Sequence, residues 1–351
     1  MITGKTKTEA MYRAVNLDSS SSLKEFSVNR RKYYKKYVLG ESVEDEENKA
    51  INMGRLVETL LMEPEEFDNR FYMSACASIP TANMLNFVEA LYKETVAATD
   101  EDGNVTKPFE DMCKEAFAQS GYSGKGNGSY ESVIKKFVGS DAEIYYNEIR
   151  KVRSNGLTVV TTEEITTAEN IVNELRSNFA TADIVNLVNT NNISVNNQLQ
   201  IEGYSVEGHL FKSMIDKVII DHQNKTISPL DLKCTWNVEN FYEEYYLYRR
   251  AYIQAYLYRE ACKSLTFTGD LLGYTVECPK FIVCDSTNYY NPLVYVLSEK
   301  DMEDAYNGFE HKGRAYPGVK EIIEDLKWAY KNGLWNISRK NYETGGLVPL
   351  K

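Results

Sequence analysis

Two aspartates and a lysine are the residues of this sequence best suited to chemistry. Asp216 ends a segment in which apolar and polar residues alternate, and Asp231 and Lys233 lie in the next such segment, after a polar turn. Strands joined by such a turn can bring Asp216 close to Asp231. Residues two apart on a strand point to the same face, so Asp231 and Lys233 share one. The carboxylates would hold a hard, oxygen-preferring cation, and the lysine would position or deprotonate a water or stabilise phosphorane-like charge.

The same residues also have a plainer interpretation. Asp231 and Lys233 would then form an exposed cross-strand or same-face ion pair, which is common and contributes little to stability. The elements and motifs in the rest of the chain decide between the two interpretations.

The periodicity of the sequence predicts the elements around these residues. Apolar residues at helical spacing predict a helix over residues 49–71, in which Pro64 stops the helix or opens the next turn. A serine-capped helix starts within residues 19–26. From residue 198 the period changes to two, as in strands. Strands are predicted over residues 198–208, 209–221 and 226–236, followed by a long aromatic helix over 238–262, further strands up to 298 and a helix over 299–335.

This order of elements favours an α/β (α+β) fold with a central mixed sheet flanked by helices and a helical N-terminal elaboration. We expect a single domain over residues 1–351, in which residues 198–298 form the core sheet and carry the catalytic motifs. Residues 76–160 combine helical patterns with two polar breaks and are interpreted as a helical insertion. Residues 340–351 are expected to form a C-terminal tail.

The motifs, taken in order, resemble those of the PD-(D/E)xK nuclease superfamily. Pro229-Leu230-Asp231-Leu232-Lys233, with Asp216 upstream, resembles its signature. Gln254 and Tyr258 match the QxxxY element of the RecB-like branch and, four residues apart, share one helix face. With the segment SSLKEF near the N-terminus, the chain is similar over nearly its whole length to exonuclease VIII (RecE-type) proteins of phages and prophages.

The resemblance implies a restriction-endonuclease-like core and a role for each matching residue. Asp216 and Asp231 would bind Mg²⁺ or Mn²⁺, with the Leu232 carbonyl as a further ligand. Lys233 would be the catalytic lysine.

Three more residues take roles from the same resemblance. Gln254 and Tyr258 would position the DNA end or the scissile strand. Gly54-Arg55-Leu56-Val57-Glu58 stands where the RecB-like branch has a GxxxH element, so Glu58 replaces the family's histidine. Glutamate is a hard oxygen ligand that suits Mg²⁺. The alternative is that Glu58 is a surface residue of the helix.

The activity that the resemblance implies is digestion of linear double-stranded DNA from its 5′ ends, which leaves 3′ single strands for phage-type homologous recombination. It also implies a homo-oligomeric ring around DNA and a single-strand annealing recombinase as partner. Two alternatives stay open. One is a different nuclease of the superfamily that acts on flaps, single strands or internal sites, and the other is a catalytically inactive DNA-binding or assembly protein.

The formal net charge of −11 is unusual for a protein that binds nucleic acid, so we expect a basic groove on an acidic surface. The segment NRRKYYKKY, residues 29–37, has five basic residues among tyrosines. Arg30, Arg31 and Lys35 would contact DNA phosphates, or the segment is a solvated helix face.

The remaining features indicate where the protein works. The six cysteines are scattered without a CxxC pair, which favours reduced thiols over an iron–sulfur site on Cys262, Cys278 and Cys284. No apolar run is long enough to cross a membrane, and the N-terminus has no secretory signal. We expect a cytoplasmic protein, in the bacterial host if a phage encodes it.

Overall fold

The computed structural model describes residues 7–41, 49–76, 80–123, 128–287 and 291–348. The chain gathers into two compact units. The first unit consists of Met1–Gly54 and Asn173–Lys351, and the second of Arg55–Val172. The predicted insertion, residues 76–160, lies inside the second unit. No helix in the described part of the chain combines the length and apolar character that a membrane span requires.

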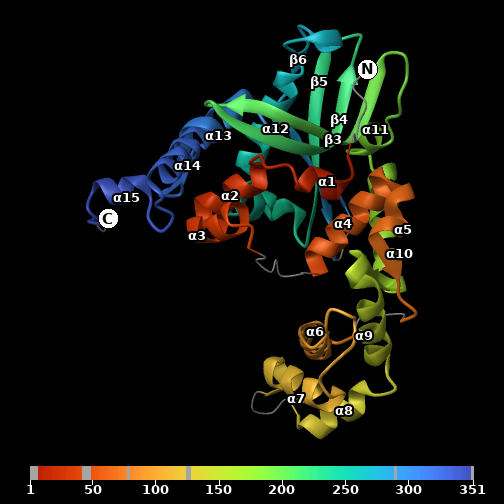
Figure 1. Cartoon of the computed structure of the whole chain (residues 1–351). Helices are drawn as coiled ribbons and strands as arrows, with labels where there is room; N and C mark the ends of the chain where they lie inside the picture. The colour runs from red at the N-terminus through yellow and green to blue at the C-terminus, as the bar shows by residue number, and fades with distance from the viewer. Residues whose placement is uncertain (1–6, 42–48, 77–79, 124–127, 288–290, 349–351) are drawn as a thin grey trace. The chain divides into compact units, whose positions relative to one another are not determined.

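A mixed sheet forms the centre of the first unit (Figure 1). Its strands lie in the order β3-β4-β5-β7-β8, and β6 pairs with β5. The pairs β3–β4, β4–β5 and β7–β8 are antiparallel, whereas β5–β7 is parallel. The strands are β3 (Ile193–Val206), β4 (His209–Asp221), β5 (Thr226–Thr235), β6 (Thr275–Val276), β7 (Lys280–Asp285) and β8 (Leu293–Val296). The predicted strands of residues 198–236 are therefore confirmed, and so is the α/β architecture.

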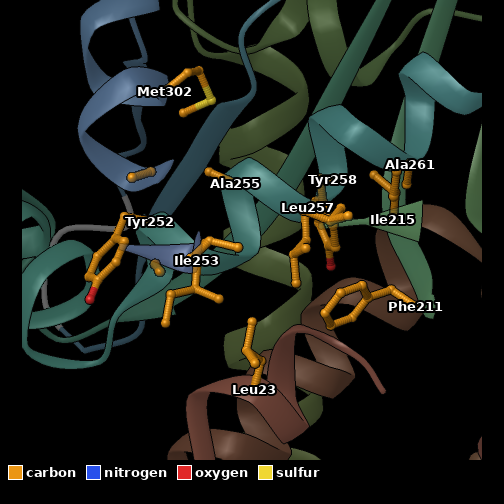
Figure 2. Close-up of a cluster of buried hydrophobic side chains, with 14 of the residues drawn as sticks. Leu23, Phe211, Ile215, Tyr252, Ile253, Ala255, Leu257, Tyr258, Ala261 and Met302 are labelled. Carbon is orange, nitrogen blue, oxygen red and sulfur yellow. The ribbon is translucent and has the colours of Figure 1, made fainter. Parts of the chain in front are cut away.

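Helices flank this sheet. The long helix α12 packs against β3, β4, β5 and β6 and also against α2 and α13. Figure 2 shows Ile253 and Leu257 of α12 close to Leu23 of α2 and Phe211 of β4, within one buried apolar cluster. The helices of this unit are α1 (Glu9–Arg13), α2 (Ser20–Val28), α3 (Arg30–Tyr33), α11 (Ala182–Val185), α12 (Ala251–Ser264), α13 (Glu299–Asn307), α14 (Val319–Asn332) and α15 (Arg339–Glu343).

The prediction of one unbroken helix over residues 238–262 is wrong. The π-helix η6 (Tyr242–Tyr248) precedes α12, and Arg250 between them has a φ of 56°, in the left-handed region. Aromatic rings pack around this break, and Tyr246 before it lies against Tyr252 after it. Phe241 lies against rings of β7 and β8, whereas Tyr252 lies against rings of the small hairpin described next.

The prediction of one helix over residues 299–335 is also wrong. Between α13 and α14 the chain forms an antiparallel hairpin of β9 (Gly308–His311) and β10 (Arg314–Pro317). Lys312 and Gly313 at its tip have φ values of 51° and 74°, as a two-residue hairpin turn requires. A Cβ atom at Gly318 would lie 2.2 Å from the Tyr306 carbonyl oxygen, so only glycine fits there. Beyond α14, the predicted tail begins within the short helix α15.

The second unit has a helical core of its own. Its largest fully buried side chains, Phe87 of α6, Phe137 of α8 and Tyr146 of α9, lie in one apolar cluster. The strands β1 and β2 pair in parallel, where the chain enters and leaves this helical core. The elements are α4 (Lys49–Met62), which begins in the first unit, α5 (Phe67–Arg70), β1 (Phe71–Met73), α6 (Ala82–Ala97), α7 (Phe109–Gln119), α8 (Tyr130–Phe137), α9 (Asp141–Val152), β2 (Thr158–Val160) and α10 (Thr162–Ser177), which ends in the first unit.

Candidate active site

Asp216 and Asp231 lie where β4 and β5 part. The ladder between these strands runs from the pair Asp221–Thr226 to the pair Lys217–Leu230, and continuing its register by one step would place Asp216 opposite Asp231. On its other edge, β5 pairs with β7 from Leu230 to Thr235. The backbone N–H of Leu232 donates to Asp216 Oδ2 over 2.8 Å, so the carboxylate bonds a backbone group beyond the end of the ladder.

The other side of β4 is irregular at the same place. Pairing with β3 passes from Asn197–Lys217 to Leu199–Ile215, and Gln198 between them has a φ of 51°. The register of the two strands is the same on both sides of Gln198, and the shift in their register lies between Glu202 and Tyr204. A left-handed conformation is uncommon for a residue other than glycine. Asp216 therefore lies across from a locally irregular residue of β3 and just beyond the last pair of the β4–β5 ladder.

Asp231 and Lys233 form an ion pair that is not on the surface. Lys233 Nζ contacts Asp231 Oδ2, and Asp231 is only 2% exposed. The plainer interpretation, an exposed pair, is wrong for this reason. A buried carboxylate must be bonded by donors, because an unpaired buried charge is strongly destabilising.

Helix α12 supplies the second donor to this carboxylate. Gln254 Nε2 donates to Asp231 Oδ1 over 2.7 Å and lies 2.8 Å from the Tyr258 hydroxyl oxygen. That hydroxyl donates to the Met214 carbonyl oxygen on β4 over 2.9 Å. Burial, and then the charges of Asp216 and Asp231, raise the pKa of Tyr258 well above its usual value. The residues of the QxxxY element thus meet Asp216 and Asp231 in one site, whereas their contact with DNA stays a prediction.

Lys24 is a further member of this site, and the sequence pattern did not predict it. Lys24 of α2 donates from Nζ to Gln254 Oε1 over 3.1 Å. Burial, and then the positive charge of Lys233, lower the pKa of Lys24 to about 8, and Asp231 opposes this shift. Lys24 stands between Leu23 and Glu25 in the SSLKEF segment, and this local pattern indicates a helix without indicating what a lysine on it would reach.

The donor set of the first unit suits a hard cation. Two carboxylates from adjacent strands, Asp216 and Asp231, offer the oxygen ligands that Mg²⁺ and Mn²⁺ prefer. Among the described residues, no group of three or more His, Cys, Asp and Glu side chains gathers into a ready-made site. Further ligands would have to be backbone oxygens, water or substrate. The Leu232 carbonyl stays a predicted ligand.

Glu58 lies on α4 in the part of that helix that belongs to the second unit, and it is half-buried. Its role as a metal ligand stays a prediction. Gly54, four residues earlier, is in the first unit, where a Cβ atom would lie 3.7 Å from Cys234 Cβ on β5. The predicted stop at Pro64 is confirmed, because α4 ends at Met62 and Pro64 begins the short 3₁₀-helix Pro64–Glu66.

The basic segment divides into cations with different surroundings. Arg30 forms an ion pair with Asp325 and lies 4.4 Å from the ring centroid of Phe26, so it helps to join α3 to α14. Arg31 and Lys35 are exposed, and Lys35 Nζ is 3.8 Å from Glu41. Contact of all three predicted residues with DNA stays a prediction.

Comparison with known proteins adds little to these observations. No protein-family model matches the chain, and no curated protein matches it. Among solved structures, a candidate exonuclease from Eubacterium rectale is similar with a TM-score of 0.47 and 13% sequence identity, over 99% of this chain and 96% of that chain. With no family or curated relative to assign a reaction, the residues of the site themselves indicate the chemistry.

Proposed function

We propose that this protein is a metal-dependent deoxyribonuclease that acts as an exonuclease on linear double-stranded DNA. The observation that supports it most directly is the meeting of Asp216, Asp231, Lys233 and Gln254 where β4 and β5 part. Two carboxylates, the buried Asp231 and the half-buried Asp216, beside an ammonium group at the end of a strand ladder are what metal-assisted phosphodiester hydrolysis needs. An ordinary structural ion pair does not have to lie at such a place.

Each side chain would have a distinct part in the reaction. Asp216 and Asp231 would hold Mg²⁺ or Mn²⁺, which when bound supplies Lewis acidity at the scissile phosphate. Lys233 places its ammonium group where it can orient the attacking water or donate to the phosphate as negative charge develops. Gln254 holds Asp231 in place through Oδ1, and Tyr258 fixes α12 to β4 through the Met214 carbonyl.

The finer parts of the proposal rest on the motif resemblance. These are 5′ to 3′ polarity, 3′ single-stranded products, a ring-shaped homo-oligomer and a single-strand annealing recombinase as partner, in phage-type recombination in the bacterial cytoplasm. Glu58 and the Leu232 carbonyl would complete the metal ligands, and the exposed Arg31 and Lys35 would contact DNA phosphates.

A digestion assay tests the proposal. Linear duplex DNA labelled at the 5′ or the 3′ end is incubated with Mg²⁺ or Mn²⁺ and with wild type, Asp231→Ala or Asp221→Ala. Asp221 is the control, because it ends β4, the strand of Asp216, and its carboxylate accepts from Gln223 and Asn224 in the turn beyond the site. We expect early release of 5′ label by wild type and Asp221→Ala, and none by Asp231→Ala.

Two other results would favour the alternatives. Cleavage of closed circular or single-stranded DNA as fast as linear duplex would indicate another nuclease activity. Binding of duplex DNA without cleavage of any substrate with either metal would indicate a DNA-binding or assembly protein, and it would overturn the proposal.

A further inference from the structure

We infer that Lys24 is a positioning residue, which fixes the direction of the Gln254 amide and, through that amide, the Asp231 carboxylate. The inference rests on the proposed function of the same site. Lys24 comes from α2, Gln254 from α12 and Asp231 from β5, so the chain of contacts crosses three elements that are far apart in the sequence.

The hydrogen bonds determine which way the amide points. A lysine ammonium group only donates, and an ionised carboxylate only accepts. Gln254 must therefore turn its oxygen to Lys24 and its nitrogen to Asp231. The amide has this orientation: Gln254 Oε1 is 3.1 Å from Lys24 Nζ, and Gln254 Nε2 is 2.7 Å from Asp231 Oδ1. The Tyr258 hydroxyl agrees with it, because it receives from Gln254 and donates to the Met214 carbonyl.

Without Lys24, no donor would hold Gln254 Oε1, and only the contacts of Nε2 would oppose a reversal of the amide. A reversed Gln254 would turn its oxygen toward Asp231 Oδ1, which removes a hydrogen bond and adds repulsion between two acceptors. A buried acceptor left without its donor is costly, so Asp231 would shift. Side chains one layer away from the reacting groups typically change rates by about 10- to 100-fold when they are removed.

Lys24 is held rigidly enough to act in this way. Its neighbour Leu23 is fully buried and points toward α12 beside Ile253, the neighbour of Gln254 (Figure 2). Arg250, just before α12, donates from Nη1 to the Ser27 carbonyl oxygen of α2 over 2.9 Å. Apolar packing and this bond therefore fix the separation of the two helices, and with it the reach of Lys24.

The charges of the site are consistent with this role. Lys24 and Lys233 balance Asp216 and Asp231, so these four side chains sum to zero. Binding of a divalent cation would make the sum +2, which is complementary to a phosphodiester that gains negative charge as it reacts. The lowered pKa of Lys24 reflects its burial and its nearness to Lys233 within this group.

Kinetics of a double-mutant cycle test the inference. Lys24→Met, Gln254→Ala and the double variant are compared with wild type on linear duplex DNA, with Lys24→Arg as the conservative change. Lys32→Met is the matched control, because Lys32 pairs with Glu25 outside the network. We expect Lys24→Met to lower kcat about 10- to 100-fold with little change in KM, and Lys24→Arg to recover most of it.

The cycle separates positioning from direct contact with DNA. If Lys24 acts through Gln254, the double variant is no slower than Gln254→Ala alone. Three results would each overturn the inference: a loss of kcat in the double variant equal to the product of the two single losses, an effect of Lys24→Met on KM alone, or wild-type activity of Lys24→Met.

A second measurement keeps the inference independent of activity. In urea unfolding, Lys24→Met and Gln254→Ala should be coupled by about fivefold in the unfolding equilibrium constant. Independent effects on unfolding would overturn the contact itself. If wild type cleaves no DNA but the unfolding cycle shows coupling, the proposed function fails while the contact stands, and Lys24 then has a structural role alone, which also overturns positioning for catalysis.

Discussion

Two carboxylates of the first unit have different kinds of partner: Asp18, whose side chain is 10% exposed, and Asp231, whose side chain is 2% exposed. Asp18 precedes α2 and accepts from the Ser22 and Tyr33 hydroxyls over 2.7 and 2.9 Å, and His209 Nε2 lies 2.8 Å from its other oxygen. These partners join α2, α3 and β4. Asp231 is contacted instead by a lysine and by an amide that is itself bonded to a second lysine.

If the proposed function holds, the difference means that low exposure and hydrogen bonding alone do not identify a functional carboxylate. Asp18 lies beside regular structure, since the Lys212 N–H of β4 bonds its carbonyl oxygen over 2.8 Å. Asp231 lies where a ladder stops, among cations. The first arrangement holds elements together with mostly neutral donors, and the second maintains a charge that a ligand can use.

The largest expected effect distinguishes the two carboxylates by activity. Asp231→Asn keeps the shape of the side chain and removes its charge, so we expect cleavage of linear duplex to fall by about a thousandfold or more. Asp18→Asn should keep cleavage within about threefold when the variants are compared at equal folded concentration. Initial rates with circular dichroism as a control for folding would measure this, and equal losses in the two variants would end the distinction.

The second prediction concerns stability, for which we expect Asp18 to have the large effect. Asp18→Ala removes the acceptor that the Ser22 and Tyr33 hydroxyls and His209 share, and we expect the free energy of unfolding to fall by about 3 kcal/mol. Urea unfolding measures the change. A loss below about 1 kcal/mol would mean that Asp18 does not hold α2, α3 and β4 together.

A third prediction concerns a buried cation on the strand of Asp216. Lys217 is 4% exposed, donates to the Val185 carbonyl oxygen of α11 over 3.2 Å, and has its pKa lowered by burial to about 8. Between about pH 8 and 10 the unfolded chain binds more protons at this residue than the folded chain, so stability rises with pH in that window. Lys24 contributes in the same direction.

Lys217→Met should therefore stabilise the protein at pH 7, and it should reduce the rise between pH 8 and 10 without abolishing it. Urea unfolding at pH 7, 8, 9 and 10 would measure both effects. Destabilisation at pH 7 would show that the bond to the Val185 carbonyl outweighs the cost of burying the ammonium group.

The smallest expected effects come from a matched pair of tyrosines. Tyr33→Phe removes a hydroxyl from Asp18 and should cost about 1 kcal/mol of stability with no change in activity. Tyr258→Phe removes the bond to the Met214 carbonyl and a contact of Gln254, so it should lower kcat about tenfold. Urea unfolding and single-turnover rates of both variants would measure these effects. A loss of activity in Tyr33→Phe, or a loss of stability without a loss of activity in Tyr258→Phe, would contradict the comparison.

The sequence predicted the parts of the fold that depend on local periodicity. Alternation in residues 198–236 predicted the strands, and the spacing of Asp231, Lys233, Gln254 and Tyr258 predicted which residues would share a face. These residues meet because the predicted strands and α12 pack as the motif order implies.

The features that the sequence did not predict depend on contacts between distant segments. The break at Arg250 is accompanied by a bond to Ser27, and the contact of Lys24 with Gln254 joins residues 230 positions apart. The hairpin at Lys312 and Gly313 did have a local signal, a glycine within a polar turn, but helical spacing on both sides obscured it.

The bond between the Leu232 N–H and Asp216 gives this protein a built-in probe of its site. Amide protons in the β4–β5 ladder are protected by backbone acceptors and exchange with solvent deuterium only when the sheet opens. The Leu232 proton is protected by a carboxylate instead. Its exchange rate and chemical shift would therefore follow whatever binds Asp216, while the neighbouring ladder protons would stay constant.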